Sequence, residues 1–134
     1  MQILNYNSLE VVQILVSVFF SIVFFQSGID KVIDRGGNID FFKEHFKKTP
    51  IKNIVPLILT ILTILELIAA GVCFFGFCNS LFYTNTDYIF YGLVLCGIVL
   101  LLLLFGQRVA KDYIGAADIT IYFILCISTI MSFK

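Results

Sequence analysis

The sequence has few charged residues, and this shortage decides the class of protein. Only 13% of the 134 residues are Asp, Glu, Lys or Arg, whereas 60% are apolar, and the mean hydropathy is +1.00. A soluble domain of this length could not bury so much hydrocarbon surface. The net charge is zero, so no basic surface indicates a nucleic-acid partner. We therefore expect a single integral membrane domain, residues 1–134, in contact with the lipid bilayer.

Tryptophan and the Cys-x-x-Cys motif are both absent. The second absence argues against a thioredoxin-type redox pair and a zinc ribbon. His45 is the only histidine and has no partner at metal-ligand spacing, so we interpret it as an interfacial surface residue. We expect no metal site, no haem ligation and no covalently bound cofactor. In place of tryptophan, the anchors at the membrane surfaces would be Tyr6, Tyr83, Tyr88, Tyr91, Tyr113 and Tyr122.

Four hydrophobic stretches approach or reach the ~20 residues that a helix needs to cross a bilayer. They are residues 11–29, 55–77, 88–105 and 116–133. Short connections make neighbouring helices antiparallel, so the sequence predicts an all-α fold, a bundle of four transmembrane helices. No basic residue precedes the first stretch, and no small-x-small site follows it. We therefore expect this stretch to be a membrane helix and not a cleaved signal peptide.

Basic residues are concentrated on one side of the predicted membrane. The connections between spans one and two and between spans three and four carry six and two, whereas the opposite side has one. Cytoplasmic loops carry the excess of Lys and Arg, so we expect both termini outside the cytoplasm. The residues are Lys31, Arg35, Lys43, Lys47, Lys48 and Lys52, then Arg108 and Lys111, and on the opposite side Lys134.

The connection between spans one and two is the one sizeable segment outside the predicted spans. Residues 36–38, Gly-Gly-Asn, are typical of a turn. After them, Ile39, Phe42 and Phe46 share one helical face, basic residues surround the others, and Pro50 would end the helix. A short basic amphipathic helix beside a membrane favours a position in the headgroup layer. We therefore expect a short interfacial helix here.

Small and weakly polar residues form a stripe along the first span. Gln13, Ser17, Ser21 and Gly28 fall at spacings of four, four and seven, which puts them on one helical face. Such residues let helices approach closely and hydrogen-bond to each other. We favour this packing role over a ligand channel.

Glu66 stands at the middle of the second span and shares a face with Thr63 and Ala70. A charge at that depth costs about 2.5–3.5 kcal/mol on insertion scales, so Glu66 must be protonated, paired or turned into the bundle. Two interpretations remain open. One is a buried ion-pair network that holds the helices together. The other is a polar pocket, open to the cytoplasm, for a quinone headgroup, an anion or a proton.

Other polar residues at the cytoplasmic ends of spans one, three and four would join this cluster. Lys31 and Arg108 have side chains long enough to extend toward Glu66. No catalytic residue can be assigned within the set. The candidates besides Glu66 are Gln26, Asp30, Lys31, Gln107, Arg108, Lys111, Asp112 and Asp118.

The four cysteines, Cys73, Cys78, Cys96 and Cys126, fall in the outer half of the predicted bundle. One interpretation is a set of redox thiols that faces an oxidising compartment. The other, which we favour, is that cysteine in a membrane helix behaves as a small apolar residue.

Three motifs, in their order and spacing, resemble the DoxX-like family of small four-helix bacterial membrane proteins. QSGIDKV closes the first span, ELIAAG contains Glu66, and FGQRVAKDYIGA follows the third span. The resemblance implies a protein of the bacterial inner membrane. The family is named for a small subunit of a terminal quinol oxidase, and other members are associated with thiol or sulfur redox chemistry. Its polar positions would correspond to Ser27, Gly28, Lys31, Glu66, Gln107 and Arg108.

This resemblance implies an accessory component of membrane redox chemistry, quinol- or thiol-based, more than an enzyme in its own right. Quinone is the candidate ligand, and other subunits of a membrane complex are the candidate partners. The sequence lacks the paired cysteines of related thiol-redox membrane proteins, which argues against direct disulfide exchange. The alternative is a non-catalytic scaffold or assembly subunit. A small transporter or channel is a third hypothesis, and it would require the chain to oligomerise.

Overall fold

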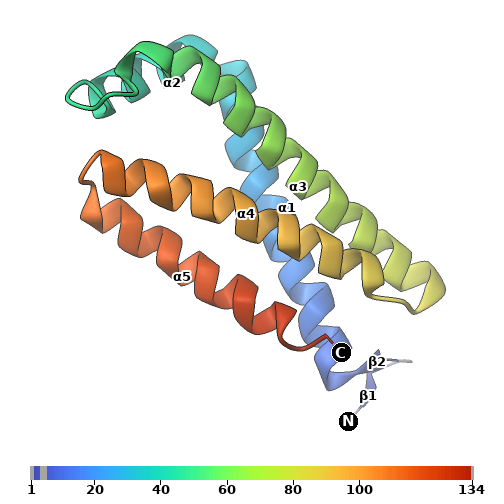
Figure 1. Ribbon diagram of the computed structural model, residues 1–134. Coiled ribbons are helices and arrows are strands. Elements are labelled where there is room, and N and C mark those ends of the chain that lie inside the picture. Colours follow the sequence, from blue (N-terminus) through green and yellow to red (C-terminus); the bar gives the residue numbers. More distant parts are fainter. Residues whose placement is uncertain (1, 4–5, 134) are drawn as a thin grey trace.

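The structure, a computed structural model, describes residues 2–3 and 6–133 and is almost entirely helical (Figure 1). Four of its helices, α1, α3, α4 and α5, are long and apolar enough to cross a membrane, as the sequence predicted. Two short strands, β1 (Gln2–Ile3) and β2 (Tyr6–Asn7), pair antiparallel ahead of them. The helices are α1 (Ser8–Ile33), α2 (Arg35–His45), α3 (Val55–Tyr83), α4 (Asp87–Val109) and α5 (Tyr113–Ile130), with a 3₁₀ turn, η1, at Lys52–Ile54.

Two of the long helices have bounds that the hydrophobic runs did not reveal. Helix α1 starts three residues earlier than predicted because Asn7 and Glu10 form a capping box. The Asn7 Oδ1 atom accepts from the Glu10 N–H at 2.9 Å, and the Glu10 side chain accepts from the Asn7 N–H at 3.2 Å. Helix α3 continues to Tyr83, well past the predicted end at residue 77, and stops where Thr84 adopts a left-handed conformation (φ 55°).

The prediction of a turn at residues 36–38 is wrong, because these residues form the first part of α2. The chain instead breaks at Asp34, whose N–H bonds to the Asp30 carbonyl and whose carboxylate accepts from the Gly37 N–H at 3.3 Å. Because the Asp34 carboxylate caps the first turn of α2, the helix can include the two glycines at positions 36 and 37. The helix also ends at His45, earlier than the proline at position 50 suggested.

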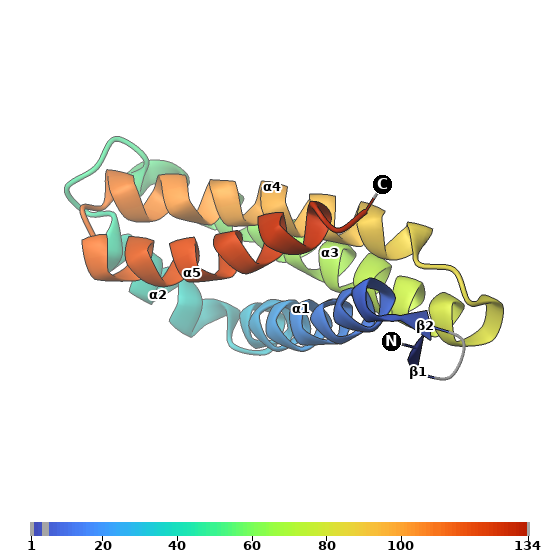
Figure 2. The ribbon, with the colours of Figure 1, turned by 90° about the horizontal axis from the view of Figure 1, so that it is seen from below.

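The four long helices pack in chain order. Helix α1 contacts α3, α3 contacts α4, and α4 contacts α5, whereas α1 makes fewer contacts with α4 and α5. The described ends of the chain lie at the same end of the molecule as the α3–α4 turn, and α2 and the α4–α5 turn lie at the other (Figures 1 and 2). The centre is filled by apolar side chains such as Phe20, Phe24, Leu93 and Leu100.

The stripe of small residues on α1 is buried, as expected for a packing face. Ser17 and Ser21 are at most 4% exposed, Gln13 is 3% exposed and Gly28 is buried. The Gln13 amide crosses to the C-terminal end of the chain, where its Nε2 donates to Ser132 Oγ at 2.8 Å. The stripe therefore joins α1 to its neighbours.

Helices α3 and α4 approach each other closely at Gly92. A Cβ atom on Gly92 would lie 2.8 Å from Cys73 Sγ and 3.0 Å from the Cys73 backbone nitrogen, so a side chain there would force the helices apart. Small residues at such crossings are typical of membrane helix packing.

The outer surface of the four long helices is apolar. Leu15, Ile22, Phe105 and Ile121 are each more than 60% exposed. Tyr83, Tyr88, Tyr91 and Tyr113 are also exposed, which suits their predicted role as anchors at the membrane surfaces. Tyr6 differs: it is buried, and its hydroxyl donates to the Ser80 carbonyl, so it fastens β2 to the end of α3.

Candidate functional site

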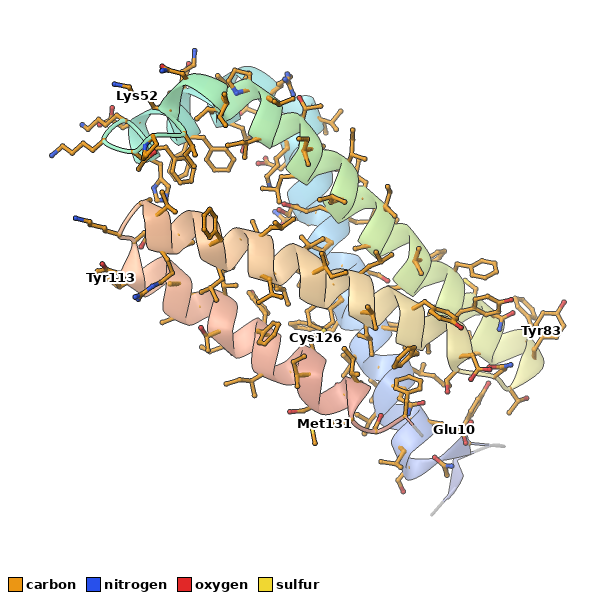
Figure 3. The ribbon with its side chains drawn as sticks, viewed as in Figure 1. Glu10, Lys52, Tyr83, Tyr113, Cys126 and Met131 are labelled. Atoms are coloured by element: carbon orange, nitrogen blue, oxygen red, sulfur yellow. The ribbon has the colours of Figure 1, made fainter. Side chains whose placement is uncertain are left out.

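A cavity of about 390 Å³ lies between α2, α3, α4 and α5. It is at the end of the bundle where α2 lies and where α3 and α4 diverge, and side chains of α2 extend into this space (Figure 3). Its wall is almost wholly apolar and includes Phe41, Phe42, Phe46 and Phe105. The volume is within the range of small-molecule sites, about 300–1,000 Å³.

Three polar side chains, His45, Gln107 and Asp112, line one part of this cavity. The His45 Nε2–H donates to Gln107 Oε1 at 2.8 Å, and Asp112 Oδ2 lies 3.8 Å from the same nitrogen. The imidazole ring is also stacked on Phe41 at 5.5 Å between centroids and packed edge-on against Phe46 at 4.9 Å. His45 is therefore fixed between an aromatic wall and a polar partner.

Local sequence explains how these groups meet. Asp112 caps α5, because its Oδ1 accepts from the Gly115 N–H at 2.9 Å. The turn before α5 is tight, with Lys111 in the left-handed region (φ 59°). A Cβ atom on Gly115 would lie 2.3 Å from Gln107 Nε2, so the glycine leaves the room in which the Gln107 amide reaches His45.

A second polar cluster lies between α1 and α3 and is closed. Glu66 is fully buried, and its Oε1 and Oε2 atoms lie 3.1 Å and 3.3 Å from Lys31 Nζ. Only the Oε2 contact has hydrogen-bond geometry, so Oε1 is paired by charge alone. Lys31 Nζ also donates to Ser27 Oγ at 2.7 Å. Although Leu62 and Leu65 line the cavity, Glu66 does not.

The other residues predicted to gather around Glu66 lie elsewhere. The Arg108 guanidinium is 4.7 Å from the centre of the Tyr113 ring, a cation–π contact. Asp30 is exposed and accepts from Asn38 Nδ2 at 3.3 Å. Gln107 belongs to the cavity. The remaining exposed candidates are Gln26, Lys111 and Asp118. The structure thus brings Lys31 to Glu66 and separates the other candidates from them.

All four cysteines lie in the described part of the chain and are free thiols. Cys73 and Cys96 are buried with their sulfur atoms 3.5 Å apart, at the crossing of α3 and α4. Cys126 is also buried, and its thiol donates to the Leu93 carbonyl at 3.1 Å. Cys78 is partly exposed. Within residues 2–3 and 6–133, no three His, Cys, Asp or Glu side chains are arranged to hold a metal ion.

The sequence analysis missed His45 as a site residue. It was interpreted as an interfacial surface residue, but its side chain is only 18% exposed, because it contacts Gln107 of α4 and packs against Phe41 and Phe46. A signal was present: His45 is three residues after Phe42 and four after Phe41, so a helix puts all three on the same side. The aromatic stripe of α2 therefore includes the histidine.

Comparisons of the chain with protein-family models, with curated proteins and with solved structures give no match.

Proposed function

We propose that this chain is a DoxX-like multi-pass protein of the bacterial inner membrane that binds a quinone in the α2–α5 cavity. Its role would be that of an accessory component of membrane redox chemistry. The observation that carries the proposal is the cavity itself, whose walls are aromatic and aliphatic and whose hydrogen-bonding groups are gathered at His45, Gln107 and Asp112.

The chemistry of a quinone matches these walls. Its flat ring can stack on phenylalanine rings, and its isoprenoid tail suits the aliphatic wall formed by side chains such as Leu62, Leu65 and Leu103. Its carbonyl oxygens accept hydrogen bonds: the Gln107 Nε2–H groups can donate one, and the His45 Nε2–H can donate one when a quinone oxygen replaces Gln107 Oε1 as its acceptor.

The proposed orientation puts the α2 end of the bundle at the cytoplasmic surface and both termini outside. It is supported by the excess of Lys and Arg in the connections at that end. We keep the proposed position of α2 at the membrane surface, but its apolar face is turned differently from the expectation based on sequence. Phe42 and Phe46 line the protein's own cavity, so α2 would cover the site at the membrane surface more than insert its apolar face into lipid.

A direct binding measurement tests the proposal. The purified chain in detergent would be titrated with a short-tailed ubiquinone by isothermal titration calorimetry. We expect saturable binding, and at least tenfold weaker binding for His45→Leu and Gln107→Leu, since each loses a hydrogen bond of about 1.5 kcal/mol or more in an apolar site. Asp118→Asn, a polar change on the exposed surface of α5, is the control and should bind as the unchanged protein does.

Absence of binding to the unchanged protein, or equal binding by His45→Leu, would remove the quinone from this cavity. The redox role needs a second experiment, gentle extraction of the native protein followed by mass spectrometry of the proteins extracted with it. Oxidase, dehydrogenase or thiol-redox subunits would support the accessory role.

A non-catalytic scaffold or assembly subunit is the second candidate, and a specific observation favours it. The Lys31–Glu66 pair is closed between α1 and α3 and has no opening to the cavity, as expected for a contact that only holds helices together. Extraction together with a complex unrelated to redox chemistry, combined with absence of quinone binding, would favour this role.

A further inference from the structure

A second hollow, of about 370 Å³, lies at the junction of α2 and α3 and shares no lining residue with the cavity. Lys43 reaches it from α2, Lys47 from the turn that follows α2, Lys52 and Asn53 from η1, and Pro56 from the first turn of α3. Three ammonium groups and an amide therefore converge where a membrane-length helix begins.

The hollow has more positive charge than its neighbours neutralise. Lys47 is paired with Glu44 at 2.6 Å, and this lysine holds the pKa of the Glu44 carboxyl below its usual range. Among the described residues, neither Lys43 nor Lys52 is within ion-pair distance of a carboxylate.

Arg35 adds a further cation beside the same wall. Its Nη2 donates to the Pro56 carbonyl at 3.4 Å and to Thr60 Oγ1 at 2.8 Å. The start of α3 has no side-chain cap, so the positive end of the helix dipole contributes as well.

An exposed apolar face leads away from the hollow along α3. Its residues recur at spacings of three and four, which puts them on one side of the helix, and each is between 47% and 59% exposed. A basic hollow joined to an apolar face matches a lipid better than a free anion. The residues are Ile54, at the end of η1, and Leu57, Ile61, Ile64 and Ile68 of α3.

We propose that this hollow binds the phosphate headgroup of an anionic phospholipid, whose acyl chains lie on the exposed face of α3. Lysine clusters at the end of a membrane helix have the chemistry that recognises such headgroups. The headgroup hollow is separate from the proposed quinone site, because the two share no lining residue and the headgroup needs only that α3 starts at a membrane surface. Of the apolar face, Ile61 alone also lines the cavity.

The test compares two sets of three charge removals at the same end of the molecule. Native mass spectrometry of the full chain in detergent would measure binding of phosphatidylglycerol and of phosphatidylcholine. We expect a preference for phosphatidylglycerol that falls at least tenfold in the variant Lys43→Gln/Lys47→Gln/Lys52→Gln. The matched control is Lys48→Gln/Arg108→Gln/Lys111→Gln, which removes three exposed charges outside the hollow and should lose less than threefold.

Glu44→Gln supplies the opposite change, since it frees Lys47 from its ion pair and should strengthen phosphatidylglycerol binding about two- to fivefold. Equal losses in the two triple variants would mean a diffuse electrostatic effect and would overturn the site. No lipid preference in the unchanged protein would overturn it too. Displacement of phosphatidylglycerol by 10 mM inorganic phosphate would show a site for free anions instead. Helical circular dichroism confirms that each variant is folded.

Discussion

Two polar contacts join helices that are distant in sequence, and they differ in access. Lys31 and Glu66 link α1 to α3 with Glu66 fully buried, whereas His45 and Gln107 link α2 to α4 at the edge of a cavity of about 390 Å³. A buried charge shows that a partner is required, but it does not show that a ligand can enter. In this molecule Glu66, the residue that costs most to bury, does not line the cavity, whereas His45 does.

The side chains around each contact explain the difference. Beside the closed pair, Gly28 lies so close to α3 that an added Cβ atom would be 2.6 Å from Leu67 Cδ2. At the open contact, Phe42 of α2 and Phe46, its C-cap residue, line the cavity together with side chains of α3 and α4. Small residues let helices close on each other, and large aromatic residues hold them apart.

The largest expected effect comes from breaking the closed pair. Lys31→Ala would leave the Glu66 carboxylate buried without its cation, so we expect a loss of about 3–5 kcal/mol in the free energy of unfolding. Quinone binding by the folded fraction should stay unchanged. Denaturation by SDS in mild detergent micelles, followed by circular dichroism, measures the loss.

The control for that experiment is the double variant Lys31→Met/Glu66→Leu. Replacing a buried ion pair by apolar side chains is often close to neutral, so the double variant should recover most of the loss. A change of less than 1 kcal/mol in Lys31→Ala would show that the pair is not closed as described.

Two glycines of α4 provide a sharper comparison, because one faces the tight crossing and the other faces the cavity. Gly92→Ala would put a Cβ atom 2.8 Å from Cys73 Sγ and should cost about 1–3 kcal/mol in unfolding free energy. Gly106→Ala would meet only the Phe46 ring, with Cζ at 3.5 Å and Cε1 at 4.0 Å, which are ordinary contacts, and should stabilise the helix by up to about 1 kcal/mol. The same SDS titration measures both, and equal effects would contradict the contrast between the two regions.

Part of this arrangement could be predicted from the sequence. The hydrophobic runs predicted the four long helices, and the cost of an intramembrane carboxylate predicted that Glu66 needs a partner. Whether Lys31 or Arg108 is that partner depends on packing, since both lie at the same end of the bundle. The fold decides it: α1 lies against α3, and Arg108 instead lies over Tyr113.

The spacing could predict that His45 lies on the same side of α2 as Phe41 and Phe42, but not what that side faces, for a related reason. An amphipathic helix beside a membrane can turn its apolar face to lipid or to its own bundle, and the same periodicity serves both. The glycine pair at positions 36 and 37 led to the wrong prediction of a turn for another reason: the side chain of Asp34 caps the helix that contains them.

A smaller effect is expected at Gly115, where a methyl group would disturb the open site alone. The added Cβ atom would overlap Gln107 Nε2, which would move the amide away from His45. We expect quinone affinity to fall about three- to tenfold, since part of one hydrogen bond is lost. The control is Gly71→Ala, because a Cβ atom there would have no neighbour within 4 Å. If Gly115→Ala binds as tightly as the control in calorimetry, the His45–Gln107 contact is not part of the site.

The smallest expected effect concerns the four cysteine thiols. They too divide into buried positions and an accessible one. Cys73, Cys96 and Cys126 are buried in the closed packing of α3, α4 and α5, whereas Cys78 is partly exposed. N-ethylmaleimide should therefore alkylate one thiol of the folded protein rapidly and all four after denaturation, as counted by mass spectrometry. Cys78→Ser should abolish the rapid reaction and change the free energy of unfolding by less than about 0.5 kcal/mol, because the residue is not in the core. Rapid labelling of Cys73 or Cys96 would mean that the α3–α4 crossing opens. It would favour a redox role for these two sulfur atoms, which are 3.5 Å apart, over simple packing.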